Sequence, residues 1–373
     1  MNVIKSKLTT IFCSFIAVIL FGCNSSGSST KPSTEKQTLK PKADFVFNDS
    51  KRSKLLVERN QVIQSSKLTY DKAVYSVIYA METDDDYILI MKSSVGNQEL
   101  AVMAPLKPKA NSSCSITKLS GTDKHSYTFD CSAGQVSKNQ DLTTYNGKYI
   151  GKSPSTIADS PDLILELQDG IGSMGSTKLK LDLVGSTATI TTQNPFAVYF
   201  GIDSTDLGVT TYSQLETLVN QSGGRETTLV FDTQINGSSD DEINMYTGLL
   251  IHDKGINTKV SKTGSVFSGG TDLFTAGKSR TLELKNPNVP VEKNKQVGVH
   301  SWADKDSSGK IVSATSIPYT NDSHRAQATY FQRMLGDKGI DFYLFTLRSA
   351  PFNGEHHMTR SELQSYQVTT SIQ

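Results

Sequence analysis

The segment that decides the fold reads GSVFSGGTDLFTAG, from Gly264 to Gly277. It follows a strand-like run, Asn257 to Val260, and its second half has the character of a short helix. Ser268 therefore stands where a strand gives way to a helix. The amide groups after it, beginning with Gly269, have no partner inside the helix and can bind a negatively charged oxygen. The simpler alternative is an ordinary serine N-cap in a Ser-Gly-Gly turn.

The glycine spacing around Ser268 resembles the nucleophile segment of the Clp protease proteolytic subunit and its relatives in the Clp/crotonase superfamily. The matching positions are Gly264, Gly270, Ala276 and Gly277. A second landmark, NKQVGVHSW at residues 294–302, is a short apolar strand that leads to His300. The resemblance extends from about residue 190 to the C-terminus and implies that Ser268 is the nucleophile and His300 the general base.

The resemblance also implies an orienting acid shortly before the last helix. Thr359 begins a Thr-x-x-Glu capping box, and counting back from it in the family's manner reaches Glu355. A glutamate can replace aspartate in such a triad. The alternative is a solvent-exposed glutamate in a loop.

The expected oxyanion loop departs from the family pattern. Relatives carry a Pro-Gly-Gly loop, whereas residues 232–240 here read DTQINGSSD. One alignment places Ser238 and Ser239 at the glycine pair, and a small insertion or deletion would place Asn236 and Gly237 there instead. Together with Gly269, these residues are the candidate oxyanion donors, and losing one such donor typically costs about 100- to 1,000-fold in rate.

The predicted fold class is a Clp protease/crotonase-like α/β C-terminal domain, with a largely parallel sheet and helices, preceded by a β-rich N-terminal domain. Strand and helix patterns alternate after the strand predicted at residues 197–202, which favours parallel pairing. The predicted divisions are a signal peptide at 1–22, a polar linker at 23–43, the β-rich domain at 44–188 and the α/β domain at 189–373.

The N-terminus resembles a bacterial lipoprotein signal. Two lysines precede an apolar run from Thr10 to Phe21, and Leu20-Phe21-Gly22-Cys23 has the form of a lipobox. The alternative is a transmembrane anchor, but this run is short for the roughly 20 residues that a span requires. The resemblance implies lipidation of Cys23. Since Asn24 follows the cysteine, a Gram-negative host would place the protein in the outer membrane, on the periplasmic side.

Two further cysteines, Cys114 and Cys131, are expected to pair in an oxidising compartment. They flank a hairpin pattern, so the disulfide is expected to be structural. The chain-entropy model gives such a loop about 3 kcal/mol of stabilisation.

Charge and composition exclude some functions. The balance of 38 basic against 37 acidic residues gives no basic footprint for nucleic acid. The acidic run Glu82 to Asp86 is most simply a hairpin turn, and the run from Asp304 imitates the start of an EF-hand loop but has Thr315 at the twelfth position. No ligand set of recognisable spacing accompanies His356-His357, so neither a metal nor a cofactor is expected.

Two functions follow as hypotheses. The first is an envelope lipoprotein with a Ser-His-Glu serine hydrolase domain, most simply a peptidase acting on peptides or proteins of the cell envelope. The second is a non-catalytic binding or scaffold lipoprotein that retains the fold. A homo-oligomer is left open by both.

Overall fold

The computed structural model describes residues 32–40, 47–119, 126–132, 135–137, 141–150, 163–306 and 308–373. The predicted signal peptide and the lipidation site Cys23 lie outside these residues. Among the described residues, no helix is both long enough and apolar enough to cross a membrane.

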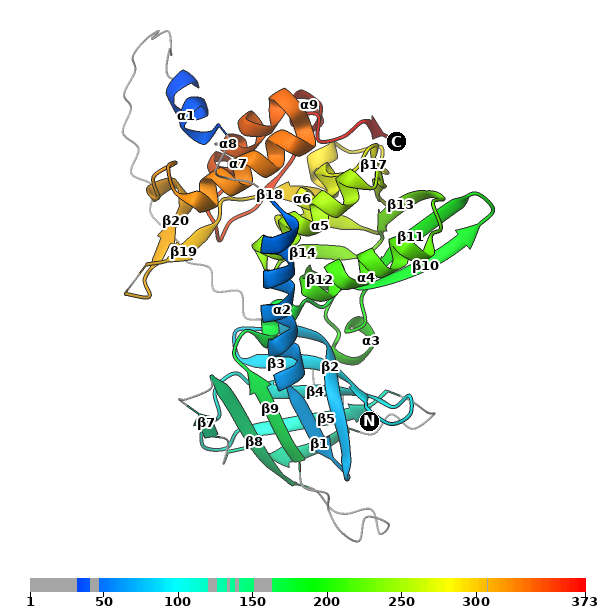
Figure 1. Ribbon diagram of the computed structural model, residues 1–373, viewed down its shortest axis with the longest axis vertical. Coiled ribbons are helices and arrows are strands. Elements are labelled where there is room, and N and C mark those ends of the chain that lie inside the picture. Colours follow the sequence, from blue (N-terminus) through cyan, green and yellow to red (C-terminus); the bar gives the residue numbers. More distant parts are fainter. Residues whose placement is uncertain are drawn as a thin grey trace.

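The N-terminal part is a closed antiparallel sheet (Figure 1). Its strands follow the order β6-β5-β4-β3-β2-β1-β9-β8-β7, and an additional pairing of β6 with β8 closes it. Alternate side chains point into a shared apolar core, among them Leu68, Val102 and Phe129. The bounds are β1 (Lys67–Tyr70), β2 (Ala73–Glu82), β3 (Asp86–Ser93), β4 (Glu99–Pro105), β5 (Ser113–Lys118), β6 (Ser126–Asp130), β7 (Gln135–Ser137), β8 (Leu142–Tyr149) and β9 (Leu163–Gln168).

The predicted disulfide between Cys114 and Cys131 is confirmed. Cys114 lies in β5, opposite Phe129 of β6, and Cys131 directly follows β6. Both cysteines are buried in the core of the closed sheet.

The C-terminal part contains two larger sheets and a small hairpin. A six-stranded sheet has the order β10-β11-β13-β15-β17-β22, and a five-stranded sheet has the order β12-β14-β16-β18-β21. The bounds of the first are β10 (Lys178–Val184), β11 (Thr187–Gln193), β13 (Glu226–Phe231), β15 (Asn257–Val260), β17 (Arg280–Leu282) and β22 (Ser371–Ile372). Those of the second are β12 (Ser204–Leu207), β14 (Gln234–Ser238), β16 (Ser265–Phe267), β18 (Val297–Val299) and β21 (His356–His357), and the hairpin is β19 (Ala303–Lys305) with β20 (Ile311–Ser313).

The predicted fold class is therefore wrong. Instead of one largely parallel sheet, the C-terminal part has two mixed sheets, since β10 pairs antiparallel with β11 and β21 antiparallel with β18. Short polar breaks divide the predicted strands: β13 ends before Asp232 and β14 begins at Gln234 in the other sheet. At the corresponding break before β16, Gly264 approaches the Phe231 carbonyl so closely that an added Cβ would lie 1.9 Å from that oxygen.

Helices cover these sheets (Figure 1). The strand predicted at residues 197–202 is instead the helical turn α3. Asn194 Oδ1 accepts hydrogen bonds from the amides of Phe196 and Ala197, and the rings of Phe196 and Phe200 lie 5.9 Å apart. The helices are α1 (Pro32–Leu39), α2 (Asp49–Ser65), α3 (Ala197–Phe200), α4 (Val209–Gln221), α5 (Asp241–Asp253), α6 (Gly269–Thr275), α7 (Asp322–Leu335), α8 (Gly339–Ser349) and α9 (Arg360–Ser365). Short 3-10 turns cover Ile171–Met174, Val291–Asn294, Ala314–Ser316 and Gly336–Lys338.

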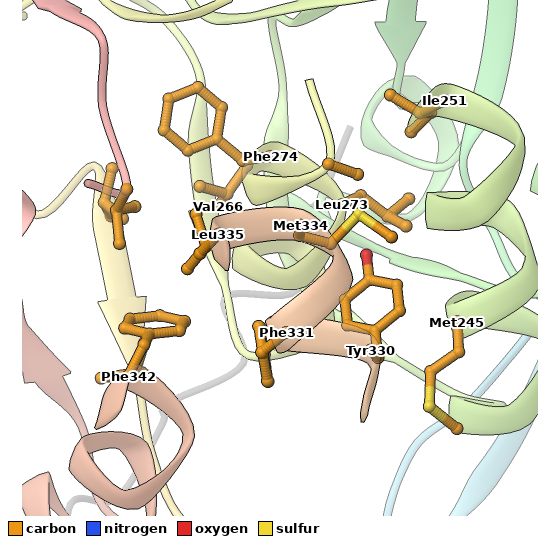
Figure 2. Packing of buried hydrophobic residues seen from close by; sticks show 14 of the residues in the cluster. Met245, Ile251, Val266, Leu273, Phe274, Tyr330, Phe331, Met334, Leu335 and Phe342 are labelled. Carbon is orange, nitrogen blue, oxygen red and sulfur yellow. The ribbon is translucent and has the colours of Figure 1, made fainter. Parts of the chain in front are cut away.

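The core of the C-terminal part extends from the two sheets to the packing of α5, α6 and α7. Figure 2 shows Tyr330, Phe331 and Met334 of α7 packed among Leu273 and Phe274 of α6 and their neighbours. Tyr330 also donates a hydrogen bond to the Asp272 carbonyl at 2.8 Å. The packing of α7 thus fixes the position of α6, the helix that follows β16.

The N-terminal helix α1 lies within the predicted polar linker, residues 23–43. It is docked on α8: Lys36 pairs with Asp341 and Glu35 with Arg348, each at 2.5 Å. Leu39 is fully buried. Residues 32–39 of the predicted polar linker thus form a packed helix, because one buried apolar residue and two ion pairs bind it to the C-terminal part. Residues 23–31 and 41–43 lie outside the described residues.

Candidate active site

Ser268 lies at the sharp turn from β16 into α6. Its backbone has φ 50° and ψ −121°, a conformation that glycine adopts easily and other residues rarely do. The surroundings hold it there: the Ser268 amide donates to the Gly298 carbonyl at 3.1 Å, and Thr271 Oγ1 donates to the same oxygen at 2.7 Å. A strained serine at a strand-to-helix turn is the geometry of a nucleophile elbow, which projects the hydroxyl out of the backbone.

His300 follows β18, the neighbour of β16, and its ring meets the serine. His300 Nε2 lies 2.8 Å from Ser268 Oγ, and His300 Nδ1 lies 2.7 Å from the Phe352 carbonyl oxygen. A carbonyl oxygen can only accept a hydrogen bond, so Nδ1 carries the ring proton and donates a hydrogen bond to the Phe352 carbonyl. Nε2 is then the acceptor for the Ser268 hydroxyl, which is the tautomer that a general base requires.

The environment keeps this imidazole neutral. Burial lowers the pKa of His300 below its ordinary value, while the hydrogen bond to Phe352 and the charge of Glu355 oppose that change in part. The Phe267 ring packs against the imidazole with centroids 4.8 Å apart. The base is therefore both fixed in orientation and available for protonation.

Glu355, the expected orienting acid, is not brought to the His300 ring. Its exposed carboxylate lies 3.3 Å from His357 Nε2, and the Phe352 carbonyl takes the position next to His300 Nδ1. Counting residues along the loop located the right segment but could not identify a main-chain oxygen as the partner. Glu355 acts on His300 only through its charge.

The candidate oxyanion residues separate into two groups. Gly237 faces Ser268: a Cβ added to it would lie 3.9 Å from Ser268 Oγ. Ser238 packs against Gly269 so tightly that a Cβ on Gly269 would lie 2.5 Å from Ser238 Cβ. Ser239 is turned away, with its amide donating to the Leu207 carbonyl at 2.9 Å. The structure thus brings Gly237, Ser238 and Gly269 together beside Ser268, and not Ser239.

A small recess of about 40 Å³ opens beside Ser268 and His300. Asp241 and Asp272 are among the residues that line it, and sequence reasoning named neither. Desolvation raises the pKa of Asp272 well above its ordinary value, and the charge of Asp241 adds to this rise. The pKa of Asp241 is also raised, first by desolvation and then by Asp240, although solvent still reaches its side chain and screens the effect. Asp272 could have been noticed in the sequence, because it stands one helical turn after Ser268.

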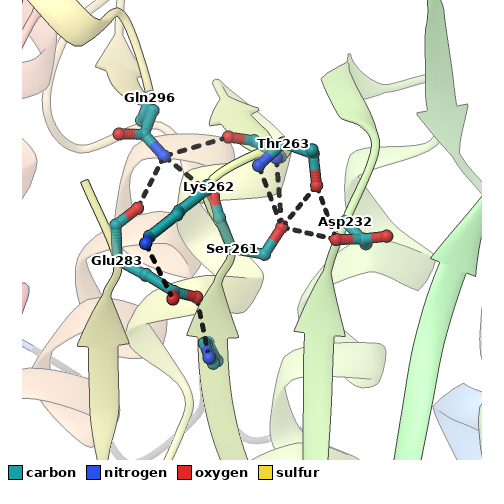
Figure 3. Close-up of polar contacts among 8 residues, drawn as sticks. Asp232, Ser261, Lys262, Thr263, Glu283 and Gln296 are labelled. Atoms are coloured by element: carbon teal, nitrogen blue, oxygen red, sulfur yellow. Dashed lines mark hydrogen bonds and ion pairs between the residues drawn. The ribbon is translucent and has the colours of Figure 1, made fainter. Parts of the chain in front are cut away.

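Hydrogen bonds of the Gln296 and Ser261 side chains, called the clamp here, join the start of β18 to the segment before β16 (Figure 3). Gln296, just before β18, donates through Nε2 to the carbonyls of Ser261, Gly264 and Glu283 at 2.8, 3.3 and 2.9 Å. Ser261 in turn donates to Asp232 Oδ1 at 2.6 Å. The clamp fixes the approach of both strands to the site.

No family model matches the chain, and no curated protein matches it. Solved structures match at low identity. An enoyl-CoA hydratase from Bacillus anthracis has 12% identity and a TM-score of 0.32, covering 52% of this chain and 69% of that one. One from Geobacillus kaustophilus HTA426 has 10% identity and a TM-score of 0.33, covering 53% and 70%. One from Thermoplasma volcanium GSS1 has 10% identity and a TM-score of 0.31, covering 52% and 71%.

With TM-scores of 0.31 to 0.33 over about half of the chain, these likenesses assign neither a fold nor a superfamily to it. They bear neither on the lipoprotein signal nor on a serine protease.

Proposed function

We propose that this chain is a serine hydrolase, most simply a peptidase, with Ser268 as nucleophile and His300 as general base. One observation carries the proposal: His300 Nε2 lies 2.8 Å from Ser268 Oγ while its Nδ1 is bound to the Phe352 carbonyl. A serine, a base within hydrogen-bond reach and a group that orients the base together make an activated nucleophile.

In the proposed reaction, Ser268 Oγ attacks the carbonyl carbon of the substrate and His300 Nε2 takes the hydroxyl proton. The resulting oxyanion is stabilised by the Gly269 amide and by the main chain at Gly237 and Ser238. His300 then gives its proton to the leaving group, and an acyl-enzyme remains on Ser268. Water, deprotonated by His300, releases the acid and restores the serine. Phe352 orients the imidazole, and Glu355 favours its protonated form through charge alone.

The experiment is labelling of the purified protein with a fluorophosphonate probe, which phosphonylates an activated serine. We expect labelling of the wild type and none of Ser268→Ala or His300→Ala. Ser265→Ala, three residues earlier on β16, is the matched control and should label normally. Labelling that survives Ser268→Ala would contradict the proposal.

We further propose that the protein is held in the bacterial cell envelope through lipid on Cys23, facing the periplasm from the outer membrane in a Gram-negative host. Its substrates would then be peptides or proteins of the envelope. The support is the lipobox-like sequence before Cys23 together with a disulfide, which is compatible with an oxidising compartment.

The second candidate function is a non-catalytic binding or scaffold lipoprotein. Two observations favour it. The recess of about 40 Å³ limits the size of a substrate group, and the Ser239 amide, bound to the Leu207 carbonyl, is lost as a candidate oxyanion donor. A folded wild type that neither reacts with the probe nor hydrolyses activated esters would decide for this alternative.

A further inference from the structure

We propose that Arg59 of α2 is a positioning residue of the hydrolase site, acting through Asp240 on the oxyanion loop, residues 237–240. This inference rests on the proposed function and deepens it. In Figure 1, α2 stands between the closed sheet and the C-terminal part. A helix from outside the two catalytic sheets would thus complete the site.

The contact between Arg59 and Asp240 is close and mostly withdrawn from solvent. Arg59 Nε lies 2.5 Å from Asp240 Oδ2, and the side chain of Asp240 is only 4% exposed. The other oxygen, Asp240 Oδ1, accepts the Ile243 amide at 3.2 Å and so caps the N-terminus of α5. Each carboxylate oxygen therefore has a separate partner, which fixes the side chain in one orientation.

Asp240 in turn fixes the position of Ser238, which lies beside Ser268. Its amide donates to Ser238 Oγ at 3.1 Å, and Ser238 packs directly against Gly269. One turn into α5, Asn244 Nδ2 donates to the Gly269 carbonyl at 3.0 Å. The first turn of α5 therefore holds both sides of the oxyanion site, and Arg59 binds the residue that begins this turn.

This arrangement offers a reason why the loop can function without a glycine pair. A Gly-Gly loop places its amides by backbone freedom alone. Here the serine-containing loop is held from outside, by an ion pair and a helix cap. Removing Arg59 would leave the Asp240 carboxylate buried without its cation and next to Asp241, a situation that favours movement of the loop toward solvent.

The test compares Arg59→Ala with Arg52→Ala on the full chain. Arg52 lies on the same helix, about two turns before Arg59, and pairs with Asp49, whose side chain is 88% exposed. Using an activated ester, we expect Arg59→Ala to lower kcat by about 10- to 1,000-fold with KM changed by less than about threefold, because losing an oxyanion donor costs about 100- to 1,000-fold and displacing one costs less. Arg52→Ala should retain wild-type kcat, Arg59→Lys should keep an intermediate rate, and added methylguanidinium should restore part of the rate of Arg59→Ala.

Hydrogen exchange provides a readout that does not require catalysis. Arg59→Ala should increase amide exchange in residues 237–240 and 269–270, whereas Arg52→Ala should leave these segments unchanged. If both variants behave alike in exchange and in kcat, the positioning role is wrong. A wild type without any hydrolase activity would instead contradict the proposed function, and the exchange comparison would still decide whether Arg59 orders the loop.

Discussion

The side-chain amide of Gln296 donates to the Ser261 carbonyl at 2.8 Å, which ties the segment leading to His300 to the segment leading to Ser268. Gln296 is 3% exposed, and its Oε1 accepts the Lys285 amide at 2.8 Å. One side chain thus satisfies main-chain groups from two other segments, residues 261–264 and 283–285. We therefore expect the 2.8 Å separation of Ser268 Oγ and His300 Nε2 to depend on this junction.

Replacing Gln296 by methionine tests that dependence, because methionine has a similar shape and makes no such hydrogen bonds. We expect unfolding free energy to fall by about 2–4 kcal/mol, since each buried polar group left unpaired costs about 1–3 kcal/mol. Probe labelling should slow at temperatures where the variant remains folded. Urea denaturation measures the first effect, and Gln364→Met at an exposed position of α9 is the control. Equal stability of the two variants would contradict the role of the junction.

Backbone strain at Ser268 can be measured by comparing two inactive variants. Ser268→Ala and Ser268→Gly both lose the hydroxyl, but only glycine relieves the conformation at φ 50°. We expect Ser268→Gly to be the more stable variant by about 1 kcal/mol or more in unfolding free energy. An alanine variant of equal or greater stability would show that the turn is not strained.

The pH dependence of probe labelling should reflect His300. The base must be neutral, and burial lowers its pKa, so the acid limb of the labelling rate should have its midpoint below the ordinary histidine value of 6.5. Glu355→Gln removes a charge that raises this pKa, so the limb should move to still lower pH with little loss of the maximal rate. A midpoint above 6.5, or an opposite shift in Glu355→Gln, would contradict this account.

Asp272 should make the stability of the protein depend on pH. Its folded-state pKa is raised, so its contribution to stability is fully present below the ordinary value of 3.8 and is lost as pH rises through the folded-state pKa. Asp272→Asn should therefore gain stability relative to wild type as pH rises. Urea midpoints from pH 4 to pH 8 measure this difference, and the exposed Asp322→Asn is the control. A difference that stays constant with pH would exclude a raised pKa.

Lipidation at Cys23 predicts a change of fractionation. Cys23→Ser in the expressing bacterium should prevent acylation and move the protein out of the membrane fraction, while probe labelling of Ser268 is retained. An unlipidated form that remains with membranes through a high-salt wash would place the anchor elsewhere.

The meeting of Ser268 and His300 was predictable from the sequence because both residues belong to short-range patterns. A glycine-flanked serine at a strand-to-helix junction and a histidine after a short apolar strand are local features, and the structure places them 2.8 Å apart. The helix at Asp241–Asp253 and the Thr359 capping box were likewise predictable from local periodicity and capping residues.

The orienting group, the sheet architecture and the outer support of the site were not predictable in this way. The Phe352 carbonyl is a main-chain atom, so residue type carries no information about it. The division into two sheets depends on close backbone approach at Gly264, and Arg59 reaches Asp240 across 181 positions of the chain. Such relationships are set by tertiary packing, which no short window of sequence contains.

The docking of α1 on α8 also bears on how the molecule would be oriented at a bilayer. Cys23 precedes Pro32, the first residue of α1, by nine positions, and a chain of that length reaches at most about 30 Å. Helix α1 lies at the end of the molecule that holds α7 and α8, away from the closed sheet (Figure 1). If Cys23 carries lipid, the C-terminal part would therefore lie close to the lipid headgroups. The closed sheet would project away from the membrane, where it could contact other molecules.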